Sequence, residues 1–233
     1  MANYEVDPAA LAPLVPAGIE LDLHDGRCFV SLVAFMFLDT RVLGLSVPFH
    51  INFEEVNLRF YVKHKAGDEL RRGVVFVKEI VPRSAIAWVA RTFYGEPYEA
   101  WSMSNSRTPG HVSYTWQKRG LTNSITADVG ENLGVPSAGS HGEFIIEHYW
   151  GYTKRGTART DEYKVEHPKW ELFSVDSAAI EVDFAATYGS GFGFLNAQEP
   201  YSVLLAKGSE ISVFKGKMLS VSSSHPVGIR ADR

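Results

Sequence analysis

The sequence has one cysteine, no long apolar run and no extended cluster of basic residues. Cys28 cannot form an intrachain disulfide, and its position at the head of the apolar stretch 28–38 predicts a small buried thiol rather than a nucleophile. No stretch approaches the roughly 20 consecutive apolar residues of a transmembrane helix. The first 18 residues contain three prolines and lack the basic start of a secretory signal. We therefore expect a cytoplasmic protein that does not associate with membranes.

The charge of the chain gives no electrostatic reason to expect a nucleic-acid partner. The 233 residues carry a formal net charge of −4, and the most basic segment is ELRRG at 69–73. Hydrophobic residues make up 45% and charged residues 21%, which is ordinary for a globular domain. No segment rich in Pro, Gly or Ser divides the chain. We expect a single domain over residues 1–233.

Motifs for metals, nucleotides and the familiar hydrolases are missing from the sequence. The eight histidines are scattered without ligand spacing, so we expect no metal and no cofactor. His148 and His167 are each followed by aromatic residues, and we interpret both as structural. The segment YGSGFGF at 188–194 has neither the spacing nor the strand-to-helix context of a phosphate loop, and we interpret it as a turn or bulge.

Ten short segments rich in β-branched and aromatic residues, each bounded by turn residues, predict strands at 28–38, 51–64, 73–81, 98–104, 111–118, 122–129, 159–166, 178–187, 201–206 and 209–214. Helical periodicity is clearest in SAIAWVARTF at 84–93, and weaker at 142–149 and 7–15. Many strands with few short helices indicate a mainly β protein, an antiparallel barrel or sandwich.

The segment FEEVNLRFYVKH at 53–64 has two different faces. Alternation puts Val56, Leu58, Phe60 and Val62 on one side and Glu55, Asn57, Arg59 and Tyr61 on the other. The polar side either meets water or lines the interior of a closed sheet, where a ligand can bind. Glu55 and Arg59 are about 13 Å apart along the strand, so they could flank a small ligand without pairing directly.

Several long segments carry a resemblance to a known family. They are LAPLVPAGIELDLHDGRCFVSLVAF at 11–35, NFEEVNLRFYV at 52–62, GVVFVKEIVPRSAIAWVARTFYGEPYEAW at 73–101, EHPKW at 166–170 and EPYSVLLAKGSEISVFKGK at 199–217. The chain resembles an uncharacterised bacterial family, domain of unknown function 2071, in the acetoacetate decarboxylase-like superfamily. The resemblance implies an antiparallel β-barrel in which a conical sheet encloses the site.

The decarboxylases of this superfamily have an Arg-Glu pair, then an aromatic residue, Gly, an apolar residue, Pro and the Schiff-base lysine. Here Arg91, Gly95 and Pro97 keep that register, but Tyr98 stands at the lysine position. Imine formation needs a primary amine, which a phenol does not supply. Lys78 precedes this segment, and we interpret it as a solvated strand lysine. Acetoacetate decarboxylase activity is therefore not expected.

The resemblance also implies that Glu55 helps to form the floor of the pocket, which agrees with the alternation of its strand. For Arg91 the resemblance and the residue pattern disagree, because Arg91 points away from the apolar stripe of its expected helix. A role at the mouth of the pocket and a solvated or ion-paired role both stay open.

Three hypotheses follow. In the first, the chain binds a small organic ligand, a carboxylate or oxo acid, through Glu55, Asn57, Arg59, Arg91 and Tyr98. In the second, it is a lysine-independent lyase, hydratase or isomerase with Tyr98 as acid and Glu55 as base. In the third, it is a scaffold for protein association. Homo-oligomers are common in this superfamily.

Overall fold

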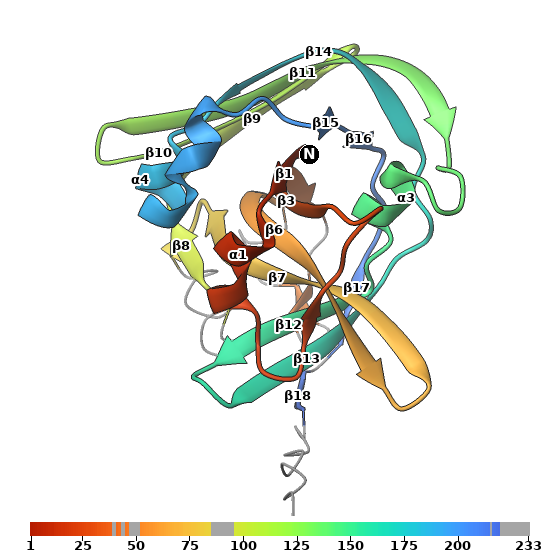
Figure 1. Ribbon diagram of the computed structural model, residues 1–233. Coiled ribbons are helices and arrows are strands. Elements are labelled where there is room, and N and C mark those ends of the chain that lie inside the picture. The colour runs from red at the N-terminus through yellow and green to blue at the C-terminus, as the bar shows by residue number, and fades with distance from the viewer. Residues whose placement is uncertain (39–40, 43–44, 47–51, 85–95, 215, 220–233) are drawn as a thin grey trace, which may run out of the picture.

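The computed structural model describes residues 1–38, 41–42, 45–46, 52–84, 96–214 and 216–219 (Figure 1). Most of these residues lie in strands that form two large sheets and one short hairpin. The expected helix over 84–93 falls outside the described residues except for its first residue, and Arg91 lies outside them too.

The larger sheet has eleven strands among the described residues. Its main order is β15 (Ser202–Val203), β1 (Ala2–Val6), β3 (Cys28–Phe37), β6 (Phe53–Ala66), β7 (Glu69–Val81), β12 (Trp150–Arg155), β13 (Arg159–Glu166) and β17 (Ser212–Val213). Three short strands pair beside this path: β2 (Glu20–Leu21) with β6, β8 (Tyr98–Ala100) with β7, and β18 (Lys217–Met218) with β13.

The second sheet has five described strands in the order β16 (Leu205–Ala206), β14 (Leu172–Glu181), β11 (Leu121–Gly134), β10 (His111–Lys118) and β9 (Ser102–Thr108). A separate hairpin joins β4 (Arg41–Val42) to β5 (Leu45–Ser46). In Figure 1 the second sheet crosses the top of the molecule, while the β12–β13 hairpin lies at the bottom.

The pairing agrees with the mainly β prediction but does not confirm the barrel. Among the described strands, neither large sheet closes on itself. Nor is the pairing wholly antiparallel, because β7 pairs in parallel with both β8 and β12. β8 is the next described strand after β7, whereas β12 comes much later in the chain, and hairpin signals in the sequence report neither parallel pairing.

Local sequence explains several turns and helix starts. Arg119 and Gly120 both have positive φ and form the two-residue connection between β10 and β11, which is the geometry of a type I′ hairpin. Asp7 caps α1 (Pro8–Leu11), which is followed by the 3₁₀ helix η1 (Ala12–Leu14).

The second expected helix is also present. Ser140 caps α3 (His141–Ile146), and Glu143 reaches back to the backbone of Gly139 in a variant of the capping box. Its residues Phe144, Ile145 and Ile146 are buried in a small apolar cluster.

Two expectations near residue 190 are wrong. The predicted strand 178–187 ends at Glu181, because Asp183 caps α4 (Phe184–Tyr188). The expected turn over 188–194 is part of the 3₁₀ helix η2 (Ser190–Ala197), whose Phe192 and Leu195 are buried in the main core. Strands β1 and β12 were not predicted from the sequence.

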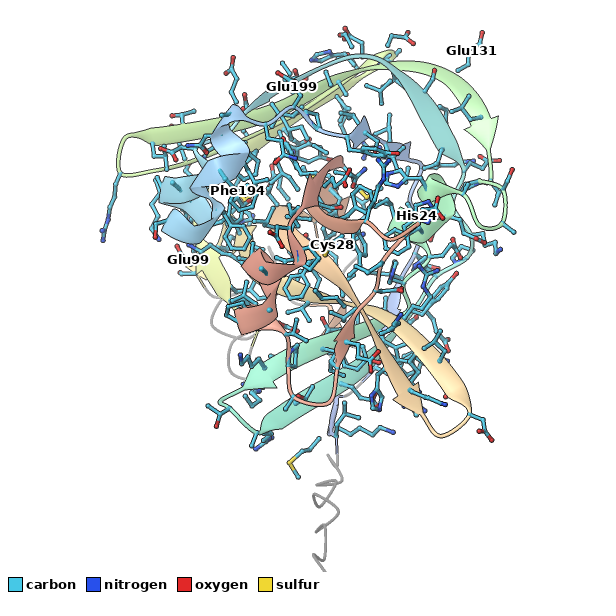
Figure 2. All side chains as sticks on the ribbon, in the orientation of Figure 1. His24, Cys28, Glu99, Glu131, Phe194 and Glu199 are labelled. Carbon is cyan, nitrogen blue, oxygen red and sulfur yellow. The ribbon has the colours of Figure 1, made fainter. Side chains whose placement is uncertain are left out.

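The main core lies against one face of β6. Val56, Leu58, Phe60 and Val62 are buried there, and the same cluster contains Trp101, Tyr114, Trp116 and Ile125. Cys28 is also buried in this cluster, as expected, and Figure 2 shows it in the interior. Burial raises the pKa of its thiol to about 11, which agrees with a structural role. The opposite face of β6 carries the polar residues.

Candidate ligand site

The registers of β6, β7 and β8 align three polar residues across the larger sheet. Asn57 on β6 lies opposite Glu79 on β7, and Glu79 lies opposite Tyr98 on β8. Directly opposite residues in a sheet put their side chains on the same face, with Cβ atoms about 5 Å apart. Glu55 lies two residues from Asn57 and therefore shares that face.

This polar face is buried rather than solvated. The exposed fractions are 2% for Glu55, 2% for Asn57, 3% for Glu79 and 4% for Glu96, whereas Tyr98 is half-buried. The interpretation in which this face meets water is therefore wrong for Glu55 and Asn57, whereas the interior of a closed sheet stays a prediction. The cost of burying such groups is normally offset by hydrogen bonds.

Hydrogen bonds connect the cluster around Glu55. The Tyr98 hydroxyl donates to Glu55 Oε2 at 3.0 Å, and Asn57 Nδ2 donates to Glu55 Oε1 at 2.9 Å. Tyr98 also hydrogen-bonds Glu79. The Tyr98 hydroxyl acts as donor toward Glu79 as well, because this contact lowers the pKa of Glu79 just as the bond to Glu55 lowers the pKa of Glu55.

The pKa values of both carboxyl groups lie above their ordinary range. Burial raises the pKa of Glu55 to about 7, although the donors Asn57 and Tyr98 oppose the rise. Burial and the neighbouring carboxylates raise the pKa of Glu79 well above its ordinary value. Glu55 therefore titrates near neutral pH, and both carboxyls keep their protons to a higher pH than an exposed glutamate does.

A second arm of the cluster is centred on Glu96. Thr153 on β12 donates to Glu96 Oε1 at 2.6 Å, and Tyr163 on β13 also hydrogen-bonds this carboxyl. Burial raises the pKa of Glu96 to about 7. Arg155 lies close enough to oppose that rise, but it is itself paired with Asp161 at 2.9 Å. The site is therefore rich in acids.

Arg59 extends the polar face of β6 beyond Asn57. Its Nη2 donates to the Ile145 carbonyl at 3.4 Å, and its guanidinium lies 5.8 Å from the centre of the Tyr61 ring. Its positive charge is felt at Glu55, where it favours the carboxylate. No ion pair joins Arg59 and Glu55 in the described part of the chain, in agreement with their expected separation.

Lys78 lies away from this cluster. Its Nζ pairs with Glu99 at 2.9 Å and donates to the Thr187 carbonyl at 2.6 Å. Its side chain is only 21% exposed, so the expectation of a solvated lysine is wrong. Alternation along β7 puts Lys78 on the face opposite Glu79, and there its amine pairs with Glu99 of β8, which is labelled in Figure 2.

Four members of the cluster were not predicted from the sequence. Glu79 follows Lys78 inside an apolar strand, and two adjacent charged residues suggest a part of the strand that is exposed to solvent. Glu96 lies in an apparent turn. Thr153 and Tyr163 lie on β12 and β13, more than 50 residues away along the chain. Only the isolated glutamate in GVVFVKEIV carries a signal that could have been used.

The two histidines interpreted as structural are packed against aromatic rings. His148 has a side chain that is 1% exposed, lies 3.6 Å from Asp22, and has a pKa lowered by burial to about 4. His167 is stacked between Tyr149 and Trp170. In the described ranges, no group of three or more His, Cys, Asp or Glu side chains is arranged to hold a metal ion.

An open depression of about 570 Å³ lies elsewhere on the surface, over β7, β12 and β13. It is not the buried acid cluster, and of the predicted site residues that the structure describes (Glu55, Asn57, Arg59 and Tyr98) none lines it. Its lining residues are Glu69, Leu70, Arg71, Arg72, Glu147, Tyr149, Trp150, Lys164, Glu166 and His167.

The fold is that of the acetoacetate decarboxylase-like enzymes. The enduracididine biosynthesis enzyme MppR, solved in complex with pyruvate, superposes with a TM-score of 0.61 over 94% of this chain and 86% of its own, at 16% identity. A structure of acetoacetate decarboxylase gives 0.58 over 92% and 85%, at 15% identity. The decarboxylase of Legionella pneumophila gives 0.54 over 94% and 83%, at 13% identity. Identities this low establish the fold alone.

The chain belongs to the DUF2071 family, described as an uncharacterized conserved protein, whose match covers residues 1–210. One relative is the uncharacterized protein YqjF of Bacillus subtilis (strain 168), 30% identical over 119 residues. That match spans 51% of this chain and 48% of the relative. None of the helices in the described residues is both long and apolar enough to span a bilayer.

Proposed function

We propose that this chain binds a small organic acid, a carboxylate or oxo acid, against the polar face of β6, within a single barrel domain. The observation that carries the proposal is the buried hydrogen-bonded set of Glu55, Asn57, Glu79 and Tyr98. A folded chain keeps several ionisable groups out of water at a considerable cost, and such clusters concentrate at functional sites. The neighbouring charge of Arg59 suits a ligand carboxylate.

Binding is proposed without imine chemistry. Tyr98 stands where the resemblance places the Schiff-base lysine, and Lys78 is bound to Glu99. Incubation with acetoacetate followed by borohydride should leave the mass of the protein unchanged. A covalent adduct on Lys78 would show that the argument from position 98 is wrong.

Titration calorimetry with pyruvate and 2-oxobutanoate tests the binding proposal directly. We expect at least one of them to bind, and Arg59→Met to weaken that binding at least tenfold because it removes the positive charge. The matched control is Arg27→Met, since Arg27 pairs with Glu5 at the surface. Absence of binding by both acids, or an unchanged affinity in Arg59→Met, would contradict the proposal.

A second candidate function is acid–base catalysis on such a ligand, as in a lyase, hydratase or isomerase. It is favoured by the contact between Tyr98 and Glu55, because a carboxyl that titrates near pH 7 can exchange a proton with a bound substrate. Glu55 would act as base and Tyr98 as hydrogen-bond donor.

This second candidate is tested once a substrate is found among candidate oxo acids. Tyr98→Phe should then abolish turnover while circular dichroism shows an intact fold. An unaltered rate in Tyr98→Phe would exclude the proposed role of the phenol.

A further inference from the structure

Three buried polar atoms of the site have no hydrogen-bond partner within the described residues: Arg59 Nε, Asn57 Oδ1 and Glu79 Oε2. Asn57 and Glu79 are 2% and 3% exposed, so water reaches neither residue freely. Buried polar atoms without partners are rare, because each one loses its hydrogen bonds to water without replacement. A ligand that supplies the missing partners would remove this cost.

The chemical character of the three atoms differs along the strand. The amide nitrogen of Asn57 is already bonded to Glu55, which leaves only the carbonyl oxygen of Asn57 free to accept. Glu79 Oε2 is also without a partner, and it accepts hydrogen bonds in the carboxylate form, which a neighbouring ammonium group favours. Arg59 Nε, in contrast, is a free donor on a cation.

These acceptors and this donor lie next to one another on one face of the sheet. Asn57 and Glu79 are opposite in register, and Arg59 follows Asn57 by two residues, or about 7 Å along the strand. A ligand here therefore meets two acceptors at one end and a cationic donor at the other.

From this arrangement we propose that the ligand is a zwitterion, a small amino acid whose ammonium group binds Asn57 Oδ1 and Glu79 Oε2 and whose carboxylate binds Arg59. The ammonium group is favoured over a hydroxyl because Glu55, Glu79 and Glu96 are all buried in this region. Among the described side chains near them, Arg59 is the one cation that is not already paired with a carboxylate. This inference rests on the proposed function, since it requires the same carboxylate contact with Arg59.

The separation between the two ends selects the length of the ligand. A step of two residues along the strand suits an amino acid whose charged groups are joined by a short carbon chain, so 4-aminobutanoate is the first probe. Butanoate and butylamine are its matched analogues, each lacking one charged group. Titration calorimetry of the unaltered protein with these three compounds and with pyruvate forms the test.

We expect 4-aminobutanoate to bind at least tenfold more tightly than butanoate or butylamine. Glu79→Met should remove this preference, because methionine has a similar shape without the acceptor oxygen, while Glu79→Gln should retain more of it. The control is Glu54→Met, since Glu54 precedes Glu55 on the same strand but bonds Asn105 at the surface. Circular dichroism checks that each variant folds.

The outcomes separate this inference from the proposed function. Equal affinities for butanoate and 4-aminobutanoate, or a preference that survives in Glu79→Met, would overturn the ammonium site while leaving the carboxylate site intact. Failure of pyruvate and of all three probes to bind would overturn the proposed function together with this inference. If Glu79→Met does not fold, the series measured on the unaltered protein still decides.

Discussion

Replacing Glu55 by glutamine should change how the stability of the protein depends on pH. Glu55 is buried, and burial raises the pKa of its carboxyl to about 7, above the ordinary value of 4.5. Between these two pH values the folded protein holds a proton at Glu55 that the unfolded chain has released. The free energy of unfolding therefore contains a contribution from Glu55 that is present below pH 4.5 and lost as the pH rises through about 7.

The size of this contribution follows from the same two values. The difference between about 7 and 4.5, at about 1.4 kcal/mol per pKa unit, corresponds to about 3 kcal/mol. Glutamine has a similar shape but no titrating proton. Relative to the unaltered protein, Glu55→Gln should thus gain about 3 kcal/mol in the free energy of unfolding between pH 4 and pH 8.

Urea denaturation followed by tryptophan fluorescence, repeated across this pH range, measures the difference between the two proteins. The two proteins must be compared because other groups titrate in the same pH range. Glu96 also lowers the free energy of unfolding as the pH rises, whereas His148 raises it. Glu54→Gln, with its surface bond to Asn105, is the control and should show no such change. If the difference in the free energy of unfolding between Glu55→Gln and the unaltered protein stayed constant with pH, the raised pKa of the buried Glu55 carboxyl would be refuted.

Three further predictions concern single side chains. Tyr98→Phe removes a hydrogen bond to the Glu55 carboxylate, worth about 1.5–3 kcal/mol, so carbon-13 NMR should show the pKa of Glu55 raised further, by about one to two units. Burial lowers the pKa of His148 from 6.5 to about 4, so the unaltered protein should lose about 3 kcal/mol of stability as the pH falls from 6.5 to 4. His148→Gln has no imidazole to protonate and should not show this loss. Gly73→Ala places a Cβ 2.5 Å from the Trp150 carbonyl oxygen and should lower the free energy of unfolding by about 1–3 kcal/mol.

Each of these predictions has a result that would contradict it. An unchanged carboxyl titration in Tyr98→Phe would mean that the phenol does not stabilise the carboxylate. Equal pH profiles for His148→Gln and the unaltered protein would mean that the imidazole is not held neutral. For Gly73→Ala the control is Gly191→Ala, where an added Cβ meets nothing within 4 Å, and equal stabilities of the two variants would count against the close approach of β7 and β12.

Local patterns in the sequence determined much of the mainly β architecture. The alternation in β6 correctly separated the apolar face from the face that carries Glu55 and Asn57, because side chains along a strand point to opposite sides in turn. Strands β10 and β13 have the predicted bounds, since turn residues on both sides mark their ends. The burial of Cys28 also followed from its apolar neighbours.

The composition of the site was decided by the tertiary structure. Glu79 joins Asn57 and Tyr98 through the registers of β7 with its two neighbours, and one of these pairings is parallel. Thr153 and Tyr163 reach Glu96 from a distant hairpin. A sequence reports which face of its strand a side chain occupies, but the registers between strands set which carboxyls meet, and their burial raises the pKa values of those carboxyls.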